Sequence, residues 1–199
     1  MMKAKIAVLV SGGGTNLQAM IDAQSKGIIK SGEIALVISG NPDAYALTRA
    51  KNAGISTAVI PSKDPDFEDK LIKKLETEKI DLVVLAGFMK ILTSKFTSRY
   101  ANRIINVHPA LIPSFCGKGY YGLKVHEEAL KYGVKVTGAT VHFVNEIPDG
   151  GKIIAQKAVK IRPGDTPETL QKRVMQQAEW IILPKACELV SKQIVKEKK

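Results

Sequence analysis

The chain has 199 residues, of which 45% are hydrophobic and 25% are charged. This composition is typical of a soluble globular protein and argues against an intrinsically disordered chain. No apolar run approaches the ~20 residues that a membrane-spanning helix needs, so we expect no membrane protein. The apolar start ending at Val10 runs into a glycine-rich segment without a cleavage site, and therefore predicts a strand and not a signal peptide.

The formal net charge is +11, and part of it comes from lysines in the last nine residues and on an apparent helix face at 70–79. This charge is either a solvated surface or a field that attracts small anionic substrates. We find no basic–aromatic interleaving and no zinc-finger pattern, so nucleic acid is not an expected partner. Two distant cysteines, Cys116 and Cys187, predict a reducing, cytoplasmic location, and no Cys/His cluster predicts a metal site.

Short apolar, β-branched runs alternate with helical stretches through the first two thirds of the chain. Nearly continuous apolar strands between helices indicate parallel strands covered on both faces. We therefore expect an α/β fold with a Rossmann-like, doubly wound, mostly parallel sheet. The predicted strands are 5–10, 33–39, 56–60, 81–87 and 103–108, and the predicted helices are 16–29, 45–53 and 67–79.

The last third of the chain has a different pattern. Two longer β segments, 136–144 and 152–161, are joined by a short connection rich in Gly, Pro and Asp, which predicts an antiparallel extension of the sheet. A final amphipathic helix over 167–193 would carry a kink or break at Pro184. Without a linker or an internal repeat, residues 1–199 are predicted to form one domain.

Ligands of such sheets collect at the carboxyl ends of the strands. After the first strand, Ser11–Asn16 contains three consecutive glycines and opens a helix, an arrangement in which free N–H groups can hold an anion. The third glycine of a dinucleotide fingerprint and the lysine of a Walker loop are both missing. The turn therefore predicts a site for one phosphate group, the alternative being a plain strand-to-helix turn.

Asn106 and His108 are two residues apart at the end of a predicted strand, so their side chains project to the same side. An amide donor beside an imidazole can stabilise an oxyanion and move a proton. Asp149, in a sharp turn, is the best candidate partner for the imidazole, although turn chemistry alone also explains an Asp-Gly pair. His142 is predicted to be a packing or supporting residue, and His126 a surface residue on a helix.

With these residues in view, the chain resembles the folate-dependent phosphoribosylglycinamide formyltransferases over essentially its whole length. The matching stretches, in order, are VSGGGTNLQAMID, DLVVLAGFMKIL, RIINVHPALIPSF, VKVTGATVHFV and DGGKIIAQ. The resemblance implies the formyltransferase fold and transfer of a formyl group from 10-formyltetrahydrofolate, as co-substrate, to the amine of glycinamide ribonucleotide in purine synthesis. It implies neither a metal nor a nucleotide cofactor.

The resemblance also implies roles for individual residues. Asn106, His108 and Asp149 match the catalytic residues of the family, and Glu179 matches a carboxylate that binds the ribose hydroxyls. The remaining matches bind the two substrates: Gly14, Thr15 and Asn16 hold the phosphate, and Met89, Lys90, Ile91, Leu92 and Asn106 line the folate cleft.

The chain departs from the family pattern at several positions. Lys90 stands where an arginine is common, an arginine expected near 62–69 is absent, and Cys116 and Lys152 replace prolines. Two alternatives remain: a formyltransferase that acts on methionyl-tRNA or an amino sugar, and a non-catalytic module that binds nucleotides or folate. A monomer and a homodimer are both compatible with the sequence.

Overall fold

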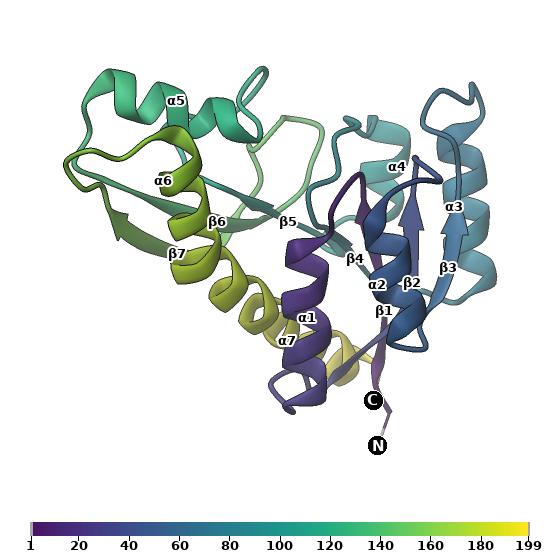
Figure 1. The fold of residues 1–199 in the computed structure, drawn as a ribbon. Helices are drawn as coiled ribbons and strands as arrows, with labels where there is room; N and C mark the ends of the chain where they lie inside the picture. Colours follow the sequence, from purple (N-terminus) through teal and green to yellow (C-terminus); the bar gives the residue numbers. More distant parts are fainter. Residues whose placement is uncertain (1, 199) are drawn as a thin grey trace.

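Seven strands form one mixed sheet at the centre of the fold (Figure 1). The structure is a computed structural model and describes residues 2–198. The strand order is β3-β2-β1-β4-β5-β6-β7; the first five strands are parallel, and β6 and β7 are each antiparallel to the preceding neighbour. The predicted fold class is therefore confirmed. The strands are β1 (Ala4–Val10), β2 (Gly32–Ser39), β3 (Ser56–Val59), β4 (Leu82–Leu85), β5 (Ile104–His108), β6 (Val136–Phe143) and β7 (Ile153–Lys160).

Helices cover both faces of the sheet, as the apolar strands require. One buried cluster joins the sheet to α1, α2, α6 and α7, and a second cluster joins the opposite face to α3 and α4. Figure 1 shows α1, α2 and α7 in front of the strands and α3 behind them. The helices are α1 (Thr15–Ser25), α2 (Tyr45–Asn52), α3 (Phe67–Thr77), α4 (Ser94–Arg99), α5 (Leu123–Tyr132), α6 (Pro167–Val174) and α7 (Trp180–Glu197).

The C-terminal helical region differs from the prediction. The helix continues through Pro184, and the irregular segment lies earlier, in the π-helical segment η1 (Met175–Glu179). Trp180, four residues before the proline, has ψ −11°, whereas a regular helix has about −42°. This rotation redirects the carbonyl that the proline ring would otherwise meet. The predicted break at Pro184 is therefore wrong, and the short helix α4 was not predicted.

The glycine turn between β1 and α1 depends on tertiary packing. Gly14 precedes α1 in a left-handed conformation with φ 72°. A Cβ atom on Gly14 would lie 2.6 Å from the Cβ atom of Ala46 in α2. Arg49, also in α2, donates from Nε to the carbonyl of Gly13 at 2.8 Å. Contacts from α2 thus hold the turn in place. The first N–H groups of α1, as in every α-helix, have no partner within the helix.

A buried hydrogen bond connects α1 to η1. Asn16 donates from Nδ2 to the Oε2 atom of Glu179 at 2.6 Å, and Glu179 is buried. Burial raises the pKa of the Glu179 carboxyl to about 7, although the bond from Asn16 opposes this shift. A carboxyl group in this position titrates near neutral pH, where ordinary glutamates are fully charged.

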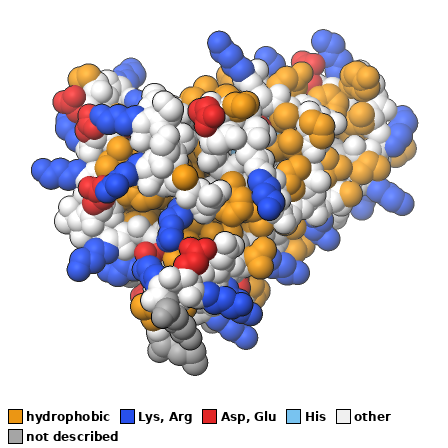
Figure 2. Space-filling model, turned by 180° about the vertical axis from the view of Figure 1, so that it is seen from behind, with side chains coloured by type: hydrophobic (Ala, Val, Ile, Leu, Met, Phe, Trp, Pro, Cys, Tyr) orange, Lys and Arg blue, Asp and Glu red, His pale blue; other side chains and the backbone are white. Residues whose placement is uncertain are grey.

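On one face of the molecule the positive charge is dispersed. On the face seen in Figure 2, Lys and Arg side chains are spread around the outline and are not collected in one patch. This distribution favours the solvated-surface interpretation of the net charge for that face. No helix among residues 2–198 is both long and apolar enough to cross a membrane.

We predict that Gly14→Ala destabilises the protein by about 2 kcal/mol, because the new Cβ atom would meet Ala46 and the residue would keep a positive φ. Denaturant unfolding measures this change. Gly13→Ala is the matched control, since no atom lies within 4 Å of its added Cβ atom. Equal stability of the two variants would contradict the packing argument.

We also predict that Glu179→Gln changes the pH dependence of stability. A folded pKa of about 7 lies above the ordinary value of 4.5, so the folded state binds more protons between these pH values. Wild-type stability should therefore fall as pH rises from about 4.5 to 7. The free energy of unfolding of the variant, relative to that of the wild type, should therefore rise by on the order of 2 kcal/mol between pH ~5 and ~8. Unfolding at both pH values, with exposed Glu33→Gln as control, tests this; a difference that does not grow with pH would refute it.

Candidate active site

A cleft opens at the carboxyl ends of β1, β4 and β5, next to the point where the strand order reverses between β1 and β4. Open α/β sheets bind ligands at this position. The cavity has a volume of about 740 Å³. Its walls include 87–92 after β4, 106–109 at the end of β5, the loop 117–122, the loop 144–149, and Asn16, His126, His142, Gln171, Met175 and Glu179.

The Asp149 carboxylate lies between two imidazoles. Oδ2 is 3.5 Å from His108 Nδ1, and Oδ1 is 3.4 Å from His142 Nε2. The backbone N–H of Gly117 also donates to Oδ2 at 2.8 Å. Burial raises the pKa of Asp149, but the two histidines and the Gly117 N–H outweigh it, so the pKa is lowered overall. Asp149 is therefore a carboxylate at neutral pH.

His108 occupies the end of β5 and is 4% exposed. Its Nε2 lies 2.8 Å from the carbonyl oxygen of Phe115, which can only accept, so Nε2 carries a hydrogen. Burial lowers the pKa of His108, and Asp149 and the Phe115 carbonyl offset this only in part. The Asp149 carboxylate raises the pKa of His108, as expected from the sequence, but burial lowers this pKa by more. Nδ1 is left facing Asp149 as the position where a proton can be gained or lost.

Asn106 pairs with His142 across the antiparallel β5–β6 ladder. The amide Nδ2 lies 3.2 Å from His142 Nε2. On the other side of the ring, His142 Nδ1 lies 2.8 Å from the carbonyl of Phe143 and must donate to it. His142 Nε2 thus lies beside both the Asn106 amide and Asp149 Oδ1.

The loop 114–122 covers this group of side chains. Phe115 has φ 49°, a left-handed conformation that directs its carbonyl to His108. Its ring packs edge-on against Tyr132 of α5 at 5.9 Å between centroids. Burial and Asp149 raise the pKa of the Cys116 thiol, which keeps it protonated and argues against a nucleophilic role.

His126 is not on the surface, contrary to the prediction. It is 0% exposed, neither ring nitrogen has a hydrogen-bond partner, and burial lowers its pKa to about 4. The helical spacing of His126 with Ala129 and Leu130 could have indicated a buried face. Arg49 was also missed, because nothing in the local sequence connects it with the glycine turn that it clamps.

The segment after β4 forms another wall of the cleft. Met89 and Ile91 are exposed there, while Leu92 is buried. Lys90 donates from Nζ to the carbonyl of Ser62 at 2.5 Å and lies 4.2 Å from the centroid of the Phe67 ring. Its ammonium group is therefore engaged within the protein.

The structure brings nearly all the predicted site residues to one cavity. Asn106, His108 and Asp149 lie together, and Asn16, Glu179 and 89–92 line the same cleft. Of the three predicted phosphate-binding residues only Asn16 lines the cleft: Gly14 is absent from its lining, and Thr15 is exposed and lines a different cavity. Among residues 2–198 no group of three or more His, Cys, Asp or Glu side chains is arranged to hold a metal ion.

The chain is similar to several known proteins. The chain is 47% identical over 184 residues to the phosphoribosylglycinamide formyltransferase of Haemophilus influenzae, covering 90% of this chain and 84% of that protein. It is 45% identical over 193 residues to the human trifunctional purine biosynthetic protein adenosine-3; the match covers 95% of this chain but only 18% of that longer protein.

A solved structure with the same fold is that of glycinamide ribonucleotide transformylase 1 from Symbiobacterium toebii. The TM-score is 0.88 at 40% sequence identity, covering 96% of this chain and 89% of that chain. The model of the formyl transferase family matches residues 4–187. Sequence, fold and cleft thus agree, and the chain belongs to the formyl transferase family.

Proposed function

We propose that this enzyme transfers the formyl group of 10-formyltetrahydrofolate to the amine of glycinamide ribonucleotide, a step of purine synthesis in the cytoplasm. The names of its relatives support this substrate pair. The observation that carries the proposal is the Asp149 carboxylate held between His108 and His142, with Asn106 beside them in the cleft. This group combines a proton-transfer site with an amide donor.

The proposed reaction is a direct acyl transfer. The substrate amine forms a bond to the formyl carbon, and the bond from that carbon to the folate nitrogen then breaks. Asn106 and protonated His108 stabilise the intervening oxyanion, and one such donor contributes about 3 kcal/mol. Asp149 stabilises the imidazolium and, through water, helps move the proton from the amine to the leaving nitrogen.

The geometry adds a requirement to this mechanism. In the structure the Nε2–H group of His108 donates to the Phe115 carbonyl. For this N–H to reach the oxyanion, the loop 114–122 has to release it when the substrates bind. When the loop moves, His108 gains a proton at Nδ1. The resulting imidazolium forms an ion pair with the adjacent Asp149 carboxylate, which favours this protonation.

The N-terminus of α1, which reaches the cleft at Asn16, would hold the acceptor, and the wall after β4 would hold the donor. The phosphate lies at the N-terminus of α1, on the N–H groups near Gly14, Thr15 and Asn16, where the helix dipole favours an anion. Glu179 accepts from the ribose hydroxyls. The folate lies along Met89, Lys90, Ile91 and Leu92, and since the Lys90 ammonium is engaged, main-chain groups contribute most of the contact.

We predict that Asp149→Asn lowers kcat by at least about 100-fold and changes both KM values little, because it removes the charge that stabilises the imidazolium. Steady-state kinetics measure both effects. Asp43→Asn, an exposed acid outside the cleft, is the control. A variant with nearly normal turnover would show that Asp149 has another role.

A formyl-transfer assay with purified protein distinguishes the alternatives. We expect 10-formyltetrahydrofolate to be consumed with glycinamide ribonucleotide as acceptor and not with methionyl-tRNA or an amino sugar. Transfer only to one of the latter acceptors would assign the other formyltransferase activity. Tight folate binding without transfer to any acceptor would favour the non-catalytic module.

A further inference from the structure

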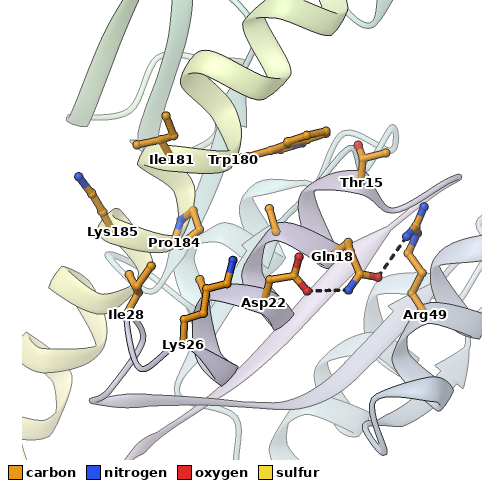
Figure 3. A pocket seen from close by; sticks show the side chains of 12 residues that line it. Thr15, Gln18, Asp22, Lys26, Ile28, Arg49, Trp180, Ile181, Pro184 and Lys185 are labelled. Atoms are coloured by element: carbon orange, nitrogen blue, oxygen red, sulfur yellow. Dashed lines mark hydrogen bonds between the residues drawn. The ribbon is translucent and has the colours of Figure 1, made fainter.

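A second cavity lies between α1 and α7, on the opposite side of α1 from the cleft. Its volume is about 380 Å³, within the range of small-molecule sites. Figure 3 shows its labelled residues coming from α1 and the turn after it below and from α7 above, with Arg49 of α2 at one end. No residue lines both this cavity and the cleft.

A thin wall divides the two cavities. Thr15 and Trp180 line the cavity between α1 and α7, whereas their sequence neighbours Asn16 and Glu179 line the cleft. The hydrogen bond between Asn16 and Glu179 lies in this wall. The two sites are thus built on the same helices but face in different directions.

The charges of the second cavity are unbalanced. Asp22 is its only carboxylate, and it accepts from Gln18 Nε2 at 2.9 Å. Gln18 in turn accepts from Arg49 at 3.1 Å, so it links the carboxylate to the guanidinium through two hydrogen bonds (Figure 3). Among residues 2–198, neither Lys26 nor Lys185 forms an ion pair. Two ammonium groups therefore remain for an anion.

Apart from Thr15, the remaining lining of this cavity is apolar. Trp180 forms one side, and Ile28 and Ile181 remain partly exposed although they are large hydrophobic residues. In Figure 3, Lys26, Ile28 and Lys185 lie toward one end, with Pro184 and Trp180 along the groove. An indole side chain beside a row of aliphatic groups suits a flat ring, and the two lysines suit an acidic group attached to it.

We propose that this groove binds a flat aromatic anion of small-metabolite size, with its acidic group between Lys26 and Lys185 and its ring against Trp180 and Pro184. The charge complementarity and the apolar wall support this class of ligand over a neutral one. The inference concerns binding alone and does not depend on the proposed reaction.

Trp180 is the only tryptophan of the chain, so its fluorescence reports on this groove. The test titrates the full-length protein with anilinonaphthalene sulfonate and follows quenching of Trp180. We expect saturable quenching, which Lys26→Glu/Lys185→Glu weakens by about tenfold or more in Kd because two attractions become repulsions. Lys73→Glu/Lys131→Glu, an equal charge change at exposed lysines elsewhere, should leave Kd unchanged.

Two further arms make the result specific. Phenylnaphthylamine has the same rings without the sulfonate, and we expect the lysine substitutions to leave its Kd unchanged. Ile91→Glu alters the cleft and should not change the quenching; if it abolishes the quenching, the dye lies in the cleft and the proposal fails. Equal Kd values for both lysine variants would also overturn it.

A second copy of the chain is the competing occupant of the groove. Sedimentation of wild type and Lys26→Glu/Lys185→Glu separates the two cases. We expect both proteins to show the same association state. If the substitutions change self-association and leave dye binding unaffected, the groove is an interface between copies and the proposal is wrong.

Discussion

The sharing of one carboxylate by two buried imidazoles is the constraint on which the cleft depends. A carboxylate taken out of water costs several kcal/mol unless charges and hydrogen bonds compensate for it. Asp149 accepts a hydrogen bond from the Gly117 N–H, and each imidazole beside it compensates its charge when that ring is protonated; these groups come from three separate segments, the loop that carries Gly117, β5 and β6. The antiparallel extension of the sheet is therefore part of the site, because it brings β6 beside β5.

The backbone around Asp149 is adapted to this contact. Asp149 has φ 56°, and Gly151 has no room for a side chain, since a Cβ atom there would lie 1.7 Å from the carbonyl of Phe143. The connection between β6 and β7 must therefore pass close to the ladder, and it holds the carboxylate over the ends of the strands. Strained conformations of this kind are kept where the surrounding contacts determine them.

Much of the architecture was predictable, since it depends on periodic patterns. The apolar runs located all seven strands to within a few residues, and the two-residue spacing placed Asn106 and His108 on one side of β5. Patterns could not predict contacts between distant elements, such as Arg49 on the glycine turn or His142 on the Asn106 amide. The short helix α4 was not predicted, because six residues are too few to show a recognisable helical periodicity.

The π-helical segment 175–179 determines how the sequence of this chain can change at the cleft. Such a segment holds one residue more than a regular helix would between the same flanking turns. Losing one codon there would restore regular winding and keep both flanking helices on their present faces. The side chain now supplied by Glu179 would rotate by about 100° around the axis, and its neighbour would enter the cleft instead. A single insertion or deletion is thus a path by which evolution can exchange the acidic group of the cleft without rebuilding its scaffold.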